Sequence, residues 1–315
     1  IASLTGAKTG LLLWFNTVLP TLLPFIILSN LIIRFQVTDY ICKVFSPIFT
    51  RLFRISNAGC YPLVIGILSG YPMGAKTCSD LLKENQLSSK EGQFLMILGN
   101  NASYMFITSF VAVSSLSLSE HKYEVAAIIY LSSIISAMIY RFNSRYSLKR
   151  FLSRLFCQRK VIEVSTYSTS LENKSNNVIP TLKSDQVLSF TTVDNCILDG
   201  FVVITKIGGY IILFSVIAQI SSILLSHFGV IKLLILGLLE ITTGIHYISQ
   251  SSLVSDAKIV LIITITAFGG LSSLAQTKSV IGDYGLSIKT YIKYKFVNCI
   301  AAFLLSMLYV LFVLK

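Results

Sequence analysis

Charged residues are scarce in this chain. Asp, Glu, Lys and Arg make up 13% of its 315 residues, whereas a soluble domain of this size carries about 25%. Hydrophobic residues make up 54%, and the mean hydropathy is +0.74. Water is therefore not the main solvent of this chain, and a soluble globular protein is disfavoured.

Signatures of catalysis and of metal binding are absent as well. The sequence contains no G-x-S-x-G, H-E-x-x-H or Walker pattern. Its six cysteines are scattered without C-x-x-C or Cys/His spacing, so neither a zinc site nor a disulfide framework is indicated. Its three histidines are widely spaced. We therefore expect no enzymatic activity, no bound metal and no cofactor.

Basic residues outnumber acidic ones, 26 to 14, and the net charge is +12. The basic residues cluster beside apolar runs and do not form a basic, aromatic-studded soluble domain, so nucleic acid is not expected as a partner. Nine of the 26 Lys and Arg residues lie between Arg141 and Lys183. Positive charge next to membrane spans marks the cytoplasmic side, so this stretch is predicted to face the cytoplasm.

Long apolar runs are the main feature of the sequence. Four of them approach or exceed the roughly 18 to 20 residues that a spanning helix requires: Gly10 to Ile33, Phe94 to Leu118, Ile207 to Leu225 and Phe296 to Leu314. The chain is therefore predicted to be an all-α membrane protein that crosses the lipid bilayer several times.

Several of the apolar segments are interrupted. Pro20 and Pro24 lie in the first span, and Asn100 and Asn101 interrupt the run that ends at Leu118. Two further apolar arms, Cys60 to Ser69 and Ile259 to Phe268, are too short to cross and end in Gly-rich turns. A turn at membrane depth is tolerated only inside protein or beside water. The two arms and their turns are therefore predicted to be re-entrant hairpins.

The two halves of the chain show the same order of features. An offset of 200 residues pairs Gly70 with Gly270, and it also pairs Ala75 with Ala275 and Thr77 with Thr277. Such recurrence is expected for a transporter with internal repeats. An odd number of crossings between the repeats would invert the second one. We expect residues 1–142 and 196–315 to be two inverted repeats with broken helices, joined by a polar, basic, cytoplasmic linker at 143–195.

The Gly-rich turns are the predicted solute site. A helix that starts at Gly74 inside the membrane would point its free N–H groups at the bilayer centre, where they suit a carboxylate. Lys76 would add a positive charge; the alternative is a loop whose lysine reaches the headgroups. The predicted substrate-binding residues are Gly70, Tyr71, Pro72, Gly74, Lys76, Asn100, Asn101, Gly270, Ser272, Ser273, Gln276 and Thr277.

Each polar candidate also has a structural interpretation. Ser272, Ser273, Gln276 and Thr277 either bind solute or hold helices together by hydrogen bonds. Asn100 and Asn101 either contact the ligand or bond between helices. Glu240 either couples transport to a proton or cation, or it caps a helix or pairs with a lysine.

Three segments resemble a known family. They are Ser69-Gly70-Tyr71-Pro72-Met73-Gly74-Ala75-Lys76, Gly237 to Gly244, and Gly269-Gly270-Leu271-Ser272. Together they resemble the sporulation integral membrane protein YlbJ family, also called SpoVV, which carries the nucleoside recognition (Gate) domain. The resemblance implies a fold related to concentrative nucleoside transporters, with hairpin tips at the substrate site, and a role in moving dipicolinate during sporulation.

The expected function is therefore that of a transporter or permease for a small polar or anionic solute, carboxylate or nucleoside-like. The alternative is a non-transporting envelope or sporulation assembly factor. Polar residues facing one shared cavity would favour transport, and a closed apolar interior would favour the alternative. The expected location is a bacterial cell membrane, with a forespore membrane as the variant implied by the resemblance. A monomer and a homo-oligomer are both compatible with the sequence.

Overall fold

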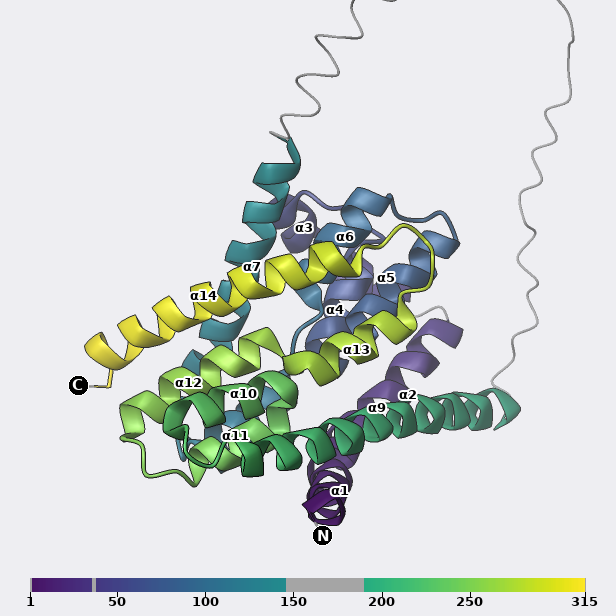
Figure 1. Ribbon diagram of the computed structural model, residues 1–315. Coiled ribbons are helices and arrows are strands. Elements are labelled where there is room, and N and C mark those ends of the chain that lie inside the picture. The colour runs from purple at the N-terminus through teal and green to yellow at the C-terminus, as the bar shows by residue number, and fades with distance from the viewer. Residues whose placement is uncertain (1, 36–37, 146–189, 315) are drawn as a thin grey trace, which may run out of the picture.

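The computed structural model describes residues 2–35, 38–145 and 190–314, and all regular elements in these ranges are helices (Figure 1). Most of the predicted linker at 143–195 lies outside the described residues. Among these residues five helical stretches, some of them broken, are long and apolar enough to cross a membrane: Ser3–Ile32, Lys122–Ser144, Phe190–Leu224, Ser255–Val280 and Ile288–Phe312. The chain is thus an all-helical, multi-pass integral membrane protein.

The first half begins with a long apolar helix that is locally unwound. Pro20 has no N–H to donate to the carbonyl of Asn16, and the chain forms π-helical turns there. The elements are α1 (Ala2–Leu13), η1 (Trp14–Val18), α2 (Leu19–Arg34), α3 (Thr38–Phe53), α4 (Cys60–Ser69), α5 (Met73–Lys83), α6 (Ser89–Gly99), η2 (Phe106–Ser115) and α7 (Lys122–Arg145).

The second half contains α9 (Phe190–Leu224), α10 (Gly229–Leu239), α11 (Ile241–Ser249), α12 (Ser255–Phe268), α13 (Gly270–Val280) and α14 (Ile288–Phe312). Single residues separate α10 from α11 and α12 from α13. These residues are Glu240 and Gly269.

Four broken pairs of helices therefore occur, two in each half. In each half a long helix precedes the two pairs, and another long helix follows them. In this order α4–α5 corresponds to α10–α11, so that Gly70 and Glu240, 170 residues apart, hold the same place. The offset of 200 predicted from the sequence instead matches α4–α5 with α12–α13, and it skips the pair α10–α11.

The predicted span Phe94 to Leu118, interrupted at Asn100 and Asn101, is two separate helices in the structure. Residues 100–103 are not helical, so α6 ends at Gly99 and η2 begins at Phe106. The sequence does place an interruption there, at the Asn pair, but the interruption divides the helix completely.

The broken pairs lie inside the molecule, and long helices surround them. Helix α1 packs along α9, while α14 packs on both α7 and α12 (Figure 1). Large apolar side chains such as Leu213 on α9 and Leu308 on α14 are exposed, as expected for helices in contact with lipid. Buried polar residues gather near the breaks, among them Asn100, Asn101 and Glu240.

Candidate functional site

The break between α4 and α5 is pressed against the break between α6 and η2. Gly70 has a φ of 72°, and a Cβ at this position would lie 2.6 Å from the backbone nitrogen of Ser103. The next residue, Tyr71, donates its N–H to the carbonyl of Asn101 at 2.8 Å. Only glycine permits this backbone angle and this close approach at no steric cost. The two breaks therefore form one packed unit.

Asn100 ties this unit to the second half of the chain. Its Oδ1 accepts the backbone N–H of Ala75 at 3.2 Å, in the first turn of α5. Its Nδ2 donates to Thr277 Oγ1 at 3.0 Å and to the Tyr291 hydroxyl at 2.9 Å. The side chain is fully buried, so all of its hydrogen bonds are made within the protein.

Glu240 forms the break between α10 and α11 and caps α11. Its Oε1 accepts the N–H of Thr242 at 3.1 Å, and its Oε2 accepts the Thr242 hydroxyl at 2.5 Å and the N–H of Thr243 at 2.6 Å. The carboxylate thus satisfies free N–H groups at the positive end of the α11 dipole. The capping interpretation of this residue is correct, and the capping carboxylate also lines a cavity.

The break between α12 and α13 is made by two glycines with positive φ. Gly269 has a φ of 90° and Gly270 a φ of 76°. Along α13, Gln276 donates from Nε2 to Ser272 Oγ at 3.2 Å, and Ser273 donates its hydroxyl to the Gly270 carbonyl at 3.0 Å. In the part of the chain that the structure describes, no side chain caps the start of α13.

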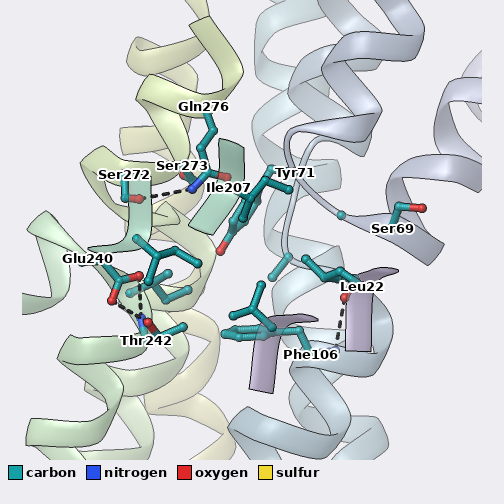
Figure 2. A pocket seen from close by; sticks show the side chains of 16 residues that line it. Leu22, Ser69, Tyr71, Phe106, Ile207, Glu240, Thr242, Ser272, Ser273 and Gln276 are labelled. Carbon is teal, nitrogen blue, oxygen red and sulfur yellow. Dashed lines mark hydrogen bonds between the residues drawn. The ribbon is translucent and has the colours of Figure 1, made fainter. Parts of the chain in front are cut away.

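Residues of three breaks and of the first two turns of α13, after the fourth break, line one cavity (Figure 2). Its polar wall contains Glu240 and Thr242 on one side, with Ser272, Ser273 and Gln276 of α13 next to them and Tyr71 facing them. Within the described ranges Glu240 is the one charged residue of this wall. The lining residues are Val18, Leu22, Ser69, Gly70, Tyr71, Ala102, Ser103, Phe106, Ile207, Ile211, Glu240, Ile241, Thr242, Ser272, Ser273 and Gln276.

Two polar side-chain atoms of the lining residues are buried without a partner among the described residues. They are the hydroxyl oxygen of Ser69 and Oε1 of Gln276. Leaving a buried polar group unpaired costs about 1 to 3 kcal/mol, so such atoms mark places where a further molecule can bind.

Six of the thirteen sequence-predicted residues lie at this cavity. Gly70, Tyr71, Ser272, Ser273, Gln276 and the coupling candidate Glu240 line it. Pro72, Gly74, Lys76, Asn100, Asn101, Gly270 and Thr277 are not among the lining residues. Asn100 and Thr277 bond to each other between helices, which is the structural interpretation of those positions.

Lys76 lies away from the cavity wall. Its ammonium pairs with Asp80 at 2.7 Å on the same face of α5, and 38% of its side chain is exposed. The start of α5 is also not free for an anion, because the amide oxygen of Asn100 already accepts the Ala75 N–H. The predicted countercharge and the predicted anion-binding helix end are therefore both engaged with partners inside the chain.

Sequence reasoning missed several residues of the site. Ser69 and Ser103 line the cavity. Lys295 and Asn298 of α14 do not line it, but they donate hydrogen bonds to residues at the breaks. A signal for the last two exists in the sequence: Tyr291, Lys295 and Asn298 recur at helical spacing within an otherwise apolar helix. Polar residues on one face of a spanning helix point to a protein interior or a wet site.

The chain is similar in sequence to known proteins. Residues 15–121, which contain the first two breaks, match the nucleoside recognition (Gate) family. Over 310 residues the chain is 28% identical to the sporulation integral membrane protein YlbJ of Bacillus subtilis (strain 168), across 92% of this chain and 73% of YlbJ. No solved structure matches the chain. The predicted resemblance is thus confirmed: the chain is a membrane protein related to YlbJ, with a nucleoside recognition (Gate) match in its first half.

Proposed function

We propose that the protein moves a small polar solute across the membrane and binds it in the cavity between the four breaks. One observation carries the proposal: three helix breaks and the start of α13, from four places in the sequence, meet at a cavity whose lining residues include unpartnered polar atoms. Helix ends at membrane depth are costly unless they face protein or an aqueous path. A protein that only packed against partners would gain nothing from keeping Ser69 and Gln276 unpaired.

The chemistry of the wall indicates how a solute would be oriented. The uncapped start of α13 is the positive end of a helix dipole and suits a carboxylate or carbonyl oxygen. Glu240 and Gln276 Oε1, in contrast, are acceptors and suit the N–H or O–H groups of the solute. A carboxylate or nucleoside-like solute with its negative or carbonyl group toward α13 meets both requirements. Dipicolinate is the carboxylate that the resemblance implies.

We also propose that the two halves are inverted repeats and that the solute lies where they meet. The recurrence of element order with α4–α5 matched to α10–α11 supports this arrangement. In transporters built in this way, one repeat rocks against the other around a site formed by discontinuous helices. Each half here contributes two of the four breaks, so such a movement would change the cavity from both sides at once.

A transport measurement tests the function directly. In proteoliposomes that contain the purified chain, we expect uptake of dipicolinate or of uridine, chosen as one carboxylate and one nucleoside. Gln276→Ala removes an acceptor from the cavity wall and should slow uptake about tenfold, the effect of about 1.4 kcal/mol.

Lys76→Ala is the matched control for this measurement. It breaks an exposed ion pair outside the cavity, which is worth about 0 to 1 kcal/mol, so its uptake should stay within about twofold of the parent rate. If liposomes without protein and proteoliposomes take up every carboxylate and nucleoside of a panel at the same rate, the non-transporting assembly factor is the better interpretation.

The side of the membrane that holds the linker is a separate prediction. The dense positive charge of residues 143–195 should keep this segment in the cytoplasm. With Cys157 replaced by serine, Ser168→Cys should react with a membrane-impermeant maleimide in permeabilised cells and stay unmodified in intact cells. Equal labelling of intact cells would place the linker outside and reverse the proposed orientation.

A further inference from the structure

Lys295 is a buried lysine in the middle of α14. Its residue exposure is 2%, although the helix around it carries apolar side chains that face outward, such as Phe296 and Ile300. A charged side chain at such a position is costly and needs partners inside the protein. Its role is separate from the cavity wall, which does not include it.

The ammonium is held by neutral oxygens from two different breaks. Nζ donates to Asn101 Oδ1 at 2.8 Å and to the Ala267 carbonyl at 3.1 Å. Asn101 lies in the break after α6, and Ala267 is in the last turn of α12. One turn further along α14, Asn298 Nδ2 donates to the same two oxygens, at 3.0 Å to Ala267 and 3.5 Å to Asn101.

In the described ranges no carboxylate pairs with Lys295, whereas Arg34 pairs with Asp199 and Lys76 with Asp80. The C-terminal ends of α6 and α12 supply negative potential instead. Asn101 Nδ2 donates to the carbonyl of Leu98 near the end of α6, and Ala267 presents its own carbonyl at the end of α12. Helix C-termini stabilise cations at this range.

We infer that the ends of α6 and α12 form a site for a monovalent cation and that the chain occupies it with its own lysine. Unwound carbonyls and half-helix C-termini are the groups that coordinate sodium in transporters with broken helices. Asn101 Oδ1 and the Ala267 carbonyl are such groups, and the unpartnered Oδ1 of the buried Asn298 is a third oxygen nearby. The junction of the two breaks therefore needs no sodium from solution.

Removing the lysine should turn the site into a sodium site. In Lys295→Ala the two oxygens keep their places and lose their cation, so an added ion can replace it. The purified full chain in detergent is unfolded by heat in sodium chloride and in choline chloride at equal ionic strength. Sodium at about 100 times its Kd should raise the folded-to-unfolded ratio of Lys295→Ala about 100-fold, and methylammonium should act in the same direction.

The parent chain and Lys293→Ala, which removes an exposed lysine of the same helix, should unfold at the same temperature in both salts. Should Lys295→Ala fail to fold in choline, Lys295→Ser, whose hydroxyl adds a ligand, gives the same comparison. Stabilisation of the parent chain by sodium would overturn the inference. So would lysine variants that neither sodium nor methylammonium restores. Neither readout involves a solute, so the result is independent of the proposed transport function.

Discussion

Glu240→Ala is expected to lower the stability of the protein by about 3 kcal/mol and to abolish solute uptake. The substitution leaves the buried N–H groups of Thr242 and Thr243 without their acceptor, at a cost of about 1 to 3 kcal/mol each. It also removes the N-cap of α11, and the loss of an N-cap by itself costs about 0.5 to 2 kcal/mol. These losses overlap, because the same hydrogen bonds are counted in both.

The effect on uptake has a second origin. The Glu240 carboxylate holds the start of α11 in place, and it also faces the cavity opposite Tyr71 (Figure 2). Glu240→Gln keeps the size of the side chain and one acceptor oxygen, but its NH₂ group meets N–H and O–H donors. We therefore expect an intermediate loss of stability and an uptake rate well below the parent rate.

Thermal unfolding in detergent and uptake in liposomes, measured on the same preparations, separate the two effects. Glu84→Ala is the matched control: Glu84 also follows a short helix, α5, but it is exposed and bonds to Gln86. This control should leave both quantities nearly unchanged. A Glu240→Ala chain that unfolds at the parent temperature would show that the carboxylate does not hold α11.

The membrane-spanning architecture and three of the four breaks could be predicted from the sequence. Hydropathy identifies the long helices, because water is absent around them and every residue that contacts lipid must be apolar. The breaks at Gly70 and Gly269 are recognisable because they need positive φ, and glycine supplies it. These local signals do not depend on the rest of the fold.

The register of the two halves could not be predicted in the same way. In the register proposed above, the break matched with Gly70 is Glu240, whose backbone is extended with a φ of −145° and needs no glycine. A search for recurring glycines therefore passes over it and stops at Gly270. Close packing is a better guide. Gly74 faces Gly66 across the first pair as Gly244 faces Gly237 across the third.

Side-chain partners across the molecule were also beyond the sequence. Lys76 and Lys295 are both lysines near Gly-rich breaks, and only the fold shows which one is buried. Lys76 lies four residues before Asp80 on an exposed helix face and pairs with it. Lys295 meets Asn101, 194 residues away. Contacts over such separations depend on how the helices pack, which local patterns do not encode.

The close approach of the helices leads to the second large prediction. Gly66 lies on α4 where a Cβ would overlap the carbonyl group of Gly99 at the end of α6, and a Cβ on Gly244 would overlap the backbone of Gly237. Both obstacles are main chain, which cannot rotate away as a side chain does. Overpacking a core costs about 1 to 3 kcal/mol and occasionally more, and we place both alanine variants at or above the upper end.

Gly66→Ala and Gly244→Ala should therefore each lower the stability by about 3 kcal/mol or more and reduce the amount of folded protein in the membrane. Gly209→Ala is the control, because Gly209 lies within helix α9 with nothing near the position of its Cβ. Alanine there should be neutral or stabilise the helix by up to about 1 kcal/mol. Size-exclusion profiles and thermal unfolding of the three variants decide the matter. In the register proposed here Gly74 matches Gly244, and a Cβ on Gly74 would lie 3.3 Å from the Cα of Gly66, so Gly74→Ala should also be destabilising. If Gly244→Ala instead behaves like Gly209→Ala while Gly74→Ala does not, α10–α11 is not packed as α4–α5 is, and the correspondence fails.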